Sequence, residues 1–209
     1  MDAADAVFAA MTGRFDEARQ SYGRSQALLS ELGLTVPLAN VHVFFAGYAE
    51  TLAGDWACAE AQMRTGYEIV ERLGEQTVLS SAAARLALVV EELDRWDDAE
   101  RYISIAAETA WVGDFDPQAL GGAAQALLHA HRGDAAVAVA RAAEAVAAAD
   151  TADDLNVLGW TLETQARVLE TAGRPDAARP ALERALDVYR RKGNDVAAAR
   201  AAAGRGRSA

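Results

Sequence analysis

The sequence predicts an all-α protein, arranged as an α-solenoid of about five antiparallel helix pairs with a short C-terminal capping helix. Alanine is the commonest residue and proline occurs four times, a balance that favours helix because alanine has the highest helix propensity and proline the lowest. Runs of β-branched and aromatic residues bounded by turn signals, which indicate strands, are missing. A short motif also returns about every 40 residues, which is the signature of stacked helical repeats.

The repeated motif is a six-residue segment that ends in alanine. Successive segments start 41, 40, 39 and 40 residues apart, and four of the five begin with glycine. Glycine adopts the left-handed conformation that ends a helix without steric cost, so each motif predicts the turn inside one helix pair. The five segments are Gly13–Ala18, Gly54–Ala59, Asp94–Ala99, Gly133–Ala138 and Gly173–Ala178.

Small residues also occur seven positions before each motif and seven positions beyond its final alanine. Seven residues are two helical turns, so these positions share a face with the turn and allow the two helices to approach closely. We therefore expect Ala99 and Ala138 to be almost fully buried. The two sets are Ala6, Gly47, Ala87, Ala126 and Ala166, and Ser25, Gly66, Ala106, Ala145 and Ala185.

Each repeat is expected to contain one helix before its turn motif and one helix after it. Asp116 and Pro117 read as an N-cap followed by proline at the first helical position, where proline is well tolerated. Asp153 and Asp154 place negative charge at the start of the first helix of the fifth pair, where it interacts favourably with the helix dipole. Pro180 predicts that the following helix starts late, near residue 179, or kinks. The expected helices are 2–12, 15–32, 37–53, 55–73, 75–93, 96–112, 117–132, 134–149, 152–172, 176–192 and a short capping helix 195–203.

Residues 1–203 are expected to form one helical-repeat domain, because no internal boundary interrupts the repeats. Residues 204–209 are expected to be a disordered tail. Nothing before Met1 covers the first helix, which suggests a segment of a longer protein or a dimer contact.

The motif resembles the tetratricopeptide repeat family. The resemblance covers the small residue of the first helix and the turn. In the second helix it covers three positions in order: an alanine, a bulky residue and a small residue. The bulky residue is Tyr22, Met63, Ile103 and Leu182 in four repeats and Ala142 in the fourth. The family usually has a period of 34 and a closing proline, of which Pro37 is the one possible example here. The resemblance implies a right-handed solenoid whose first helices line a concave surface.

The longer period is similar to the C-terminal repeat region of large bacterial LuxR/MalT-type ATP-dependent transcription regulators and related cyclase-like proteins. The stretch Arg179–Gly193 resembles the final repeat of those regions. This resemblance implies a segment that senses a signal or assembles with a partner.

The tetratricopeptide resemblance also implies a set of groove residues for a partner or effector. Among them, we expect Phe44, Tyr48 and Trp160 to project toward one concave surface, since aromatic residues are favoured as interface anchors. The alternative is that many of these residues pack against the neighbouring helix. The candidate groove residues are Phe44, Tyr48, Leu52, Leu88, Glu92, Leu127, His131, Trp160, Glu163 and Arg167.

The formal charge of −11, from 31 acidic and 20 basic residues, argues against direct binding to nucleic acid or to a membrane. The first residues are acidic where a secretory leader is basic, so we expect a cytoplasmic protein. Cys58 is the only cysteine, which excludes an internal disulfide and a cysteine-based zinc site.

Catalytic and metal motifs are not indicated. His129 and His131 stand two positions apart on a helix, so their rings point in different directions and do not favour a metal. Adjacent acidic pairs are typical of solvated helix turns, and no phosphate-binding loop or nucleophile elbow occurs. We therefore expect no enzyme activity, no cofactor and no metal.

The sequence best predicts a protein-interaction or self-association scaffold, the sensor or assembly segment of a bacterial signalling or transcription regulator. Its partner would be a protein, a peptide or a second copy, since an apolar groove rimmed by charge suits an amphipathic helix or extended peptide. The alternative is a domain that binds a small-molecule effector in the concave groove.

Overall fold

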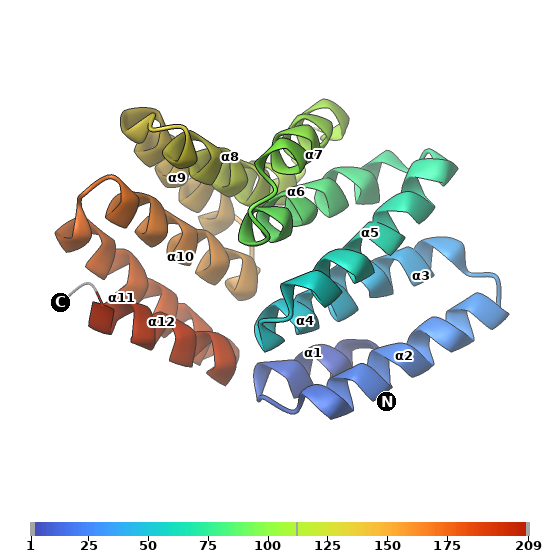
Figure 1. Cartoon of the computed structure of the whole chain (residues 1–209). Helices are drawn as coiled ribbons and strands as arrows, with labels where there is room; N and C mark the ends of the chain where they lie inside the picture. The colour runs from blue at the N-terminus through green and yellow to red at the C-terminus, as the bar shows by residue number, and fades with distance from the viewer. Residues whose placement is uncertain (1–2, 112, 208–209) are drawn as a thin grey trace.

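The computed structural model describes residues 3–111 and 113–207, which form helices joined by short turns, with no strand among them (Figure 1). The all-helical prediction is confirmed. The helices are α1 Ala3–Met11, α2 Phe15–Glu31, α3 Thr35–Asn40, η1 Val41–Gly47, α4 Tyr48–Ala53, α5 Trp56–Leu73, α6 Gln76–Glu92, α7 Trp96–Thr109, η2 Pro117–Gly121, α8 Gly122–His131, α9 Ala135–Asp150, α10 Leu155–Thr171, α11 Pro175–Lys192 and α12 Asp195–Arg207.

The five predicted turns all contain a left-handed residue at the first position of the motif. The φ angles are 79° at Gly13, 74° at Gly54, 59° at Asp94, 84° at Gly133 and 72° at Gly173. Asp94 takes this conformation in place of glycine because a short polar side chain tolerates it better than most others. The predicted position of the turn within each motif is therefore confirmed.

The alanine that ends each motif is packed between helices. None of the five is more than 1% exposed, which confirms the predicted burial of Ala99 and Ala138. Gly66 shows how closely the helices approach, since a Cβ atom there would lie 2.6 Å from Val43 Cγ2 and 2.7 Å from the carbonyl oxygen of Ala39. The five alanines are Ala18, Ala59, Ala99, Ala138 and Ala178.

Four helices differ from the prediction. The expected helices 37–53 and 117–132 contain the π-helical segments η1 and η2. Helix α11 begins at Pro175, whose missing N–H is not needed in the first turn, and continues through Pro180 instead of starting late. Helix α12 extends through residues 204–207, which the sequence assigns to a disordered tail, while 208 and 209 lie outside the described residues.

The first helices of the pairs form an inner layer, and the second helices lie outside it. Every residue from Ser80 to Glu91 of α6 is buried, whereas its partner α7 buries one face. No helix in the described ranges is both long enough and apolar enough to span a bilayer.

The two ends of the chain pack together. Helix α12 contacts α1, and Figure 1 shows these two helices next to each other in the lower part of the view. Asn194 Nδ2, at the start of α12, donates a hydrogen bond of 2.9 Å to Tyr48 Oη in α4. Asn156 Nδ2 in α10 lies 3.7 Å from Met11 Sδ in α1. The described chain is thus closed upon itself, in contrast to the open concave surface that the family resemblance implies.

Candidate binding site

Two cavities lie between the inner helices, and both are lined by Trp160 of α10. The aromatic pocket has a volume of about 410 Å³ and the charged pocket about 270 Å³. The aromatic pocket is lined by Val7, Phe44, Tyr48, Ser81, Arg85, Phe115, Asp116, Asp154, Asn156, Val157 and Trp160. The charged pocket is lined by Trp56, Glu92, Trp160, Glu163, Thr164, Ala166, Arg167, Glu170, Leu182, Arg200 and Gly204.

The aromatic pocket collects three of the residues that the sequence analysis placed in a groove. Phe44 comes from η1, Tyr48 from α4 and Trp160 from α10. The rings of Tyr48 and Trp160 lie with centroids 6.3 Å apart at an interplanar angle of 42°. Tyr48 is only 7% exposed, because Asn194 and the closing helix α12 cover it.

A buried ion pair forms the polar side of this pocket. Arg85 donates a hydrogen bond of 3.0 Å from Nε to Asp116 Oδ2 and places a terminal nitrogen 2.9 Å from the same oxygen, and the two residues are 7% and 4% exposed. The guanidinium carbon of Arg85 lies 4.9 Å from the ring centroid of Phe44. Asp116 Oδ1 is buried and has no hydrogen-bond partner among the described residues.

The expected N-cap role of Asp116 is wrong. Its side chain makes no capping hydrogen bond, and its backbone is already helical, with φ −60° and ψ −50°. The carboxylate is instead used by Arg85, because the pairing neutralises a guanidinium that α6 carries into the interior.

Two further carboxylates lie at the same end of the inner helices. Asp114 is 7% exposed and accepts a hydrogen bond of 2.6 Å from Ser80 Oγ. Burial raises the pKa of Asp114, while the Ser80 hydrogen bond acts in the opposite direction. Asp154 lines the pocket and caps α10 by accepting from two backbone N–H groups.

The charged pocket holds three other predicted residues, each in an ion pair. Glu163 accepts two hydrogen bonds from Arg200, at 3.0 and 2.8 Å, and a third from Tyr189 Oη at 2.7 Å. Arg167 of α10 pairs with Glu92 of α6. These pairs link α10 to α12 and α6 across the centre, so they help to divide the interior into separate cavities.

Three predicted groove residues line neither cavity. Leu52, Leu88 and Leu127 are 5%, 2% and 6% exposed. Their assignment to a binding surface stays a prediction, since Tyr48 is equally buried and still lines a cavity. His131 is exposed at the end of α8, where its ring stacks on Trp96 with centroids 4.0 Å apart.

Arg85 and Asp116 are two of the pocket residues that were not predicted from the sequence. A signal was present for Arg85, since it interrupts the otherwise apolar run Ala82–Val90, and a charged residue inside such a run needs a partner. Asp116 gave no comparable signal, because an acidic residue before proline is typical of a helix N-terminus.

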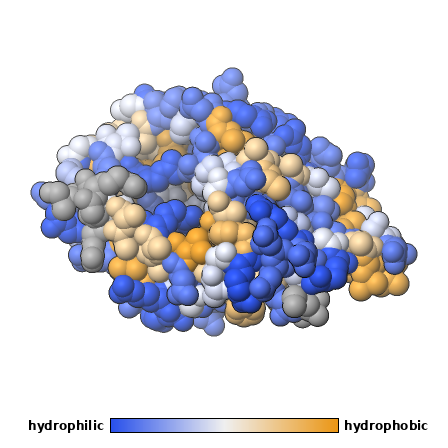
Figure 2. Space-filling model, turned by 60° about the horizontal axis from the view of Figure 1, so that its bottom comes forward, coloured by the Kyte–Doolittle hydropathy of each residue, from blue (hydrophilic) through white to orange (hydrophobic). Residues whose placement is uncertain are grey.

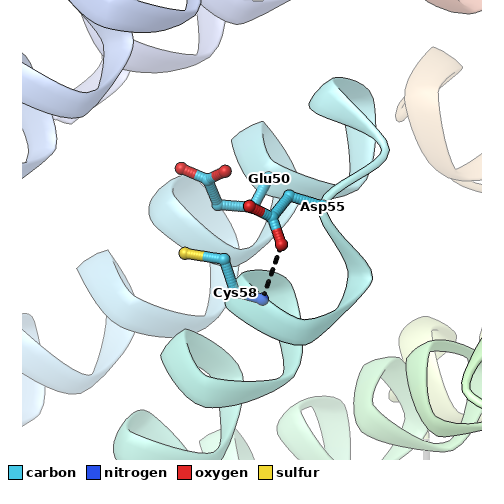
Figure 3. A group of neighbouring side chains, drawn as sticks. All are labelled: Glu50, Asp55 and Cys58. Carbon is cyan, nitrogen blue, oxygen red and sulfur yellow. Dashed lines mark hydrogen bonds between the residues drawn. The ribbon is translucent and has the colours of Figure 1, made fainter.

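A separate group of possible metal ligands lies between α4 and α5. One ligand atom each from Glu50, Asp55 and Cys58 falls within 4.8 Å of the others (Figure 3). Glu50 accepts two hydrogen bonds from Arg19, at 3.0 and 2.7 Å, and one from Tyr22 at 2.7 Å. Asp55 caps α5 through the backbone N–H of Cys58, and burial raises the pKa of the Cys58 thiol. The cluster is therefore explained by structural contacts: Glu50 links α4 to α2, and Asp55 caps α5.

The sequence matches no protein-family model and no curated protein. A structural comparison finds that the fold is similar to the crystal structure of BtubC (BKLC) from P. vanneervenii, with a TM-score of 0.53. The two chains are 18% identical, and the similarity covers 84% of this chain and 77% of that one. At this level of identity the likeness concerns the fold alone.

Proposed function

We propose that the chain is a non-catalytic binding module, a closed variant of the tetratricopeptide-like solenoid, which receives a small organic molecule in the aromatic pocket. The recurring turn and the buried small residues support the repeat class. We further propose that such a module is the sensor segment of a cytoplasmic signalling or transcription regulator, a proposal that the sequence resemblance to bacterial LuxR/MalT-type regulators supports.

One observation carries this proposal: the inner helices form a half-open pocket of about 410 Å³ lined by Phe44, Tyr48 and Trp160. Pockets for small molecules are typically about 300–1,000 Å³, mostly apolar, with a few well-placed polar groups. The ion pair of Arg85 and Asp116 supplies those polar groups. A peptide helix needs a long open groove, and the contacts between α6, α10 and α12 interrupt that surface.

A screen of small organic molecules by thermal shift, followed by calorimetric titration of the hits, tests the proposal. Trp160→Ala should remove binding, since Trp160 lines the pocket, whereas Trp111→Ala should bind as the parent does. Trp111 is a matched control because it is 57% exposed and does not line either cavity.

Hits that bind the Trp160→Ala protein as tightly as the parent would contradict the site. The helical circular dichroism signal of each variant must match the parent, which separates loss of the pocket from loss of the fold.

A second candidate function is self-association or protein binding through an apolar edge. Leu28, Leu32, Leu34 and Leu73 are 55%, 61%, 45% and 52% exposed, at the ends of α2 and α5 and in the turn after α2. Contacts of α3 with both α2 and α5 bring these ends to one side. Figure 2 shows apolar residues in orange at the right-hand edge of the molecule, the side on which the α2–α3 turn lies in Figure 1.

Sedimentation velocity over a range of protein concentrations tests this second candidate. The double variant Leu32→Glu/Leu73→Glu should remain monomeric where the parent associates, because charged residues resist burial in an interface. Val137→Glu, at a residue 44% exposed on α9, is the control. A parent that stays monomeric at all concentrations, or a double variant that associates equally, contradicts self-association through this edge.

A further inference from the structure

We infer that the ligand of the aromatic pocket is a small organic cation: an ammonium group carried on an aromatic or apolar body. The inference rests on the proposed function, because it specifies the chemical class of molecule for that same pocket. Three features of the pocket carry it.

The first feature is the balance of charge. Asp116 and Asp154 line the pocket, and Arg85 is the one cationic residue among its lining residues. Asp114 is buried close behind them, two residues from Asp116. Arg200 lines the charged pocket, and its guanidinium is held there by two hydrogen bonds to Glu163. The excess of carboxylates attracts a cation and repels an anion.

The second feature is the unused oxygen of Asp116. Arg85 makes its hydrogen bond and its ion pair to Oδ2, so Oδ1 is left buried without a partner among the described residues. A buried acceptor without a donor is costly, and the cost is greater for a charged group. Asp116 lines the pocket, and an ammonium group, with three N–H donors and a positive charge, is a suitable partner for such a carboxylate.

The third feature is the aromatic wall. Phe44, Tyr48, Phe115 and Trp160 surround the cavity. Aromatic faces attract cations, most strongly where water is excluded. The position of Arg85 over the ring of Phe44, with 4.9 Å between guanidinium carbon and centroid, shows one such contact already in place. The same rings accommodate an apolar ligand body.

Three molecules of nearly equal shape test the charge preference: phenylethylamine, phenylethanol and phenylacetate. Their affinities can be measured by NMR titration, following the indole N–H signal of Trp160, assigned with the Trp160→Phe variant. The amine should bind about tenfold or more tightly than the alcohol, the difference expected for one charge-assisted hydrogen bond. Phenylacetate should bind more weakly than the alcohol.

Variants locate the preference at Asp116. Asp116→Asn should reduce the affinity for the amine about tenfold and change that for the alcohol less than twofold. Asp150→Asn, which removes a carboxylate paired with Arg184 on the surface, should leave both affinities unchanged. Because Asp116→Asn leaves Arg85 buried alone, the double variant Arg85→Gln/Asp116→Asn serves if the single variant unfolds, and in it the amine preference should disappear.

An alcohol or acid that binds as tightly as the amine would overturn the cation inference while supporting the pocket as a small-molecule site. An amine preference that survives in the double variant also overturns it. If none of the three molecules shifts the Trp160 signal, the cation inference fails, and the proposed function is then decided separately by the library screen.

Discussion

At the scale of single residues, the closest contacts are made where a side chain is missing. Gly66 of α5 lies against Val43 and the backbone of Ala39, and Gly159 lies against the ring of Tyr189. In both places a methyl group would overlap atoms that are held by the surrounding helices. The spacing of the repeat predicted a small residue at Gly66, which lies seven residues beyond the alanine that ends its motif.

Gly66→Ala should destabilise the protein by about 1–3 kcal/mol, since the added Cβ meets a backbone oxygen that cannot move alone. Gly23→Ala is the matched control, because Gly23 is helical and a Cβ there meets no atom within 4 Å. That variant should gain about 0.5–1 kcal/mol from the better helix propensity of alanine. Urea unfolding measures both changes, and equal effects of the two substitutions would contradict the packing described for α3 and α5.

Glu91 is a second feature at this scale, and it makes the stability depend on pH. It is 4% exposed, both carboxyl oxygens lack a partner among the described residues, and burial raises its pKa well above the usual range. The folded protein therefore holds a proton that the unfolded chain releases above its ordinary pKa of about 4.3. This contribution to stability is complete below that value and is lost as the pH rises.

Glu91→Gln should consequently be more stable than the parent at a pH of about 8, with the difference shrinking toward a pH of about 5. Melting temperatures of both proteins across this range measure the effect. A constant difference at every pH would show that the carboxyl group of Glu91 does not titrate in the folded protein.

At the scale of helices, the turns and most boundaries could be predicted because glycine and the small residues act locally. The π-helical segments η1 and η2 could not, because an inserted residue in a helix depends on the packing of its neighbours more than on its own sequence. Helix α12 was predicted too short for a related reason. Its alanine-rich end has little amphipathic pattern, and its burial comes from contacts with α1 and α11.

Substitutions of Asn194 test how α12 is held in place, since the Asn194 side chain both caps α12 and binds two residues of other helices. Oδ1 caps the helix through the N–H of Ala197, and Nδ2 donates to Tyr48 and Asn156. Asn194→Asp keeps the capping acceptor and removes the donor, so it should still destabilise the protein by about 1–3 kcal/mol, because buried acceptors lose their partner. Asn194→Ala should cost more, since it also removes the cap.

Thermal and urea unfolding of the two variants measure these losses. An aspartate variant as stable as the parent would mean that the hydrogen bonds to Tyr48 and Asn156 do not hold α12 in place.

At the scale of the whole molecule, the repeats predicted the helix pairs but not how the pairs close. Small rotations between successive pairs add up along the array, and the total rotation cannot be predicted from a local sequence pattern. The contact between Asn194 and Tyr48, 146 residues apart, is the result. This closure explains why the predicted groove residues are divided: Phe44, Tyr48 and Trp160 line a cavity, while Leu52, Leu88 and Leu127 pack inside the molecule.

The aromatic pocket depends on this closure of the chain, since Val7 of α1 and Trp160 of α10 both line the pocket. Small-angle X-ray scattering of the monomeric protein, extrapolated to zero concentration, measures the closure most directly. A compact chain of this length should have a radius of gyration of about 17 Å and a scattering curve that agrees with the closed structure. A radius several ångströms larger, with the elongated distance distribution of an open solenoid, would show that α1 and α12 do not meet in solution and would contradict the account.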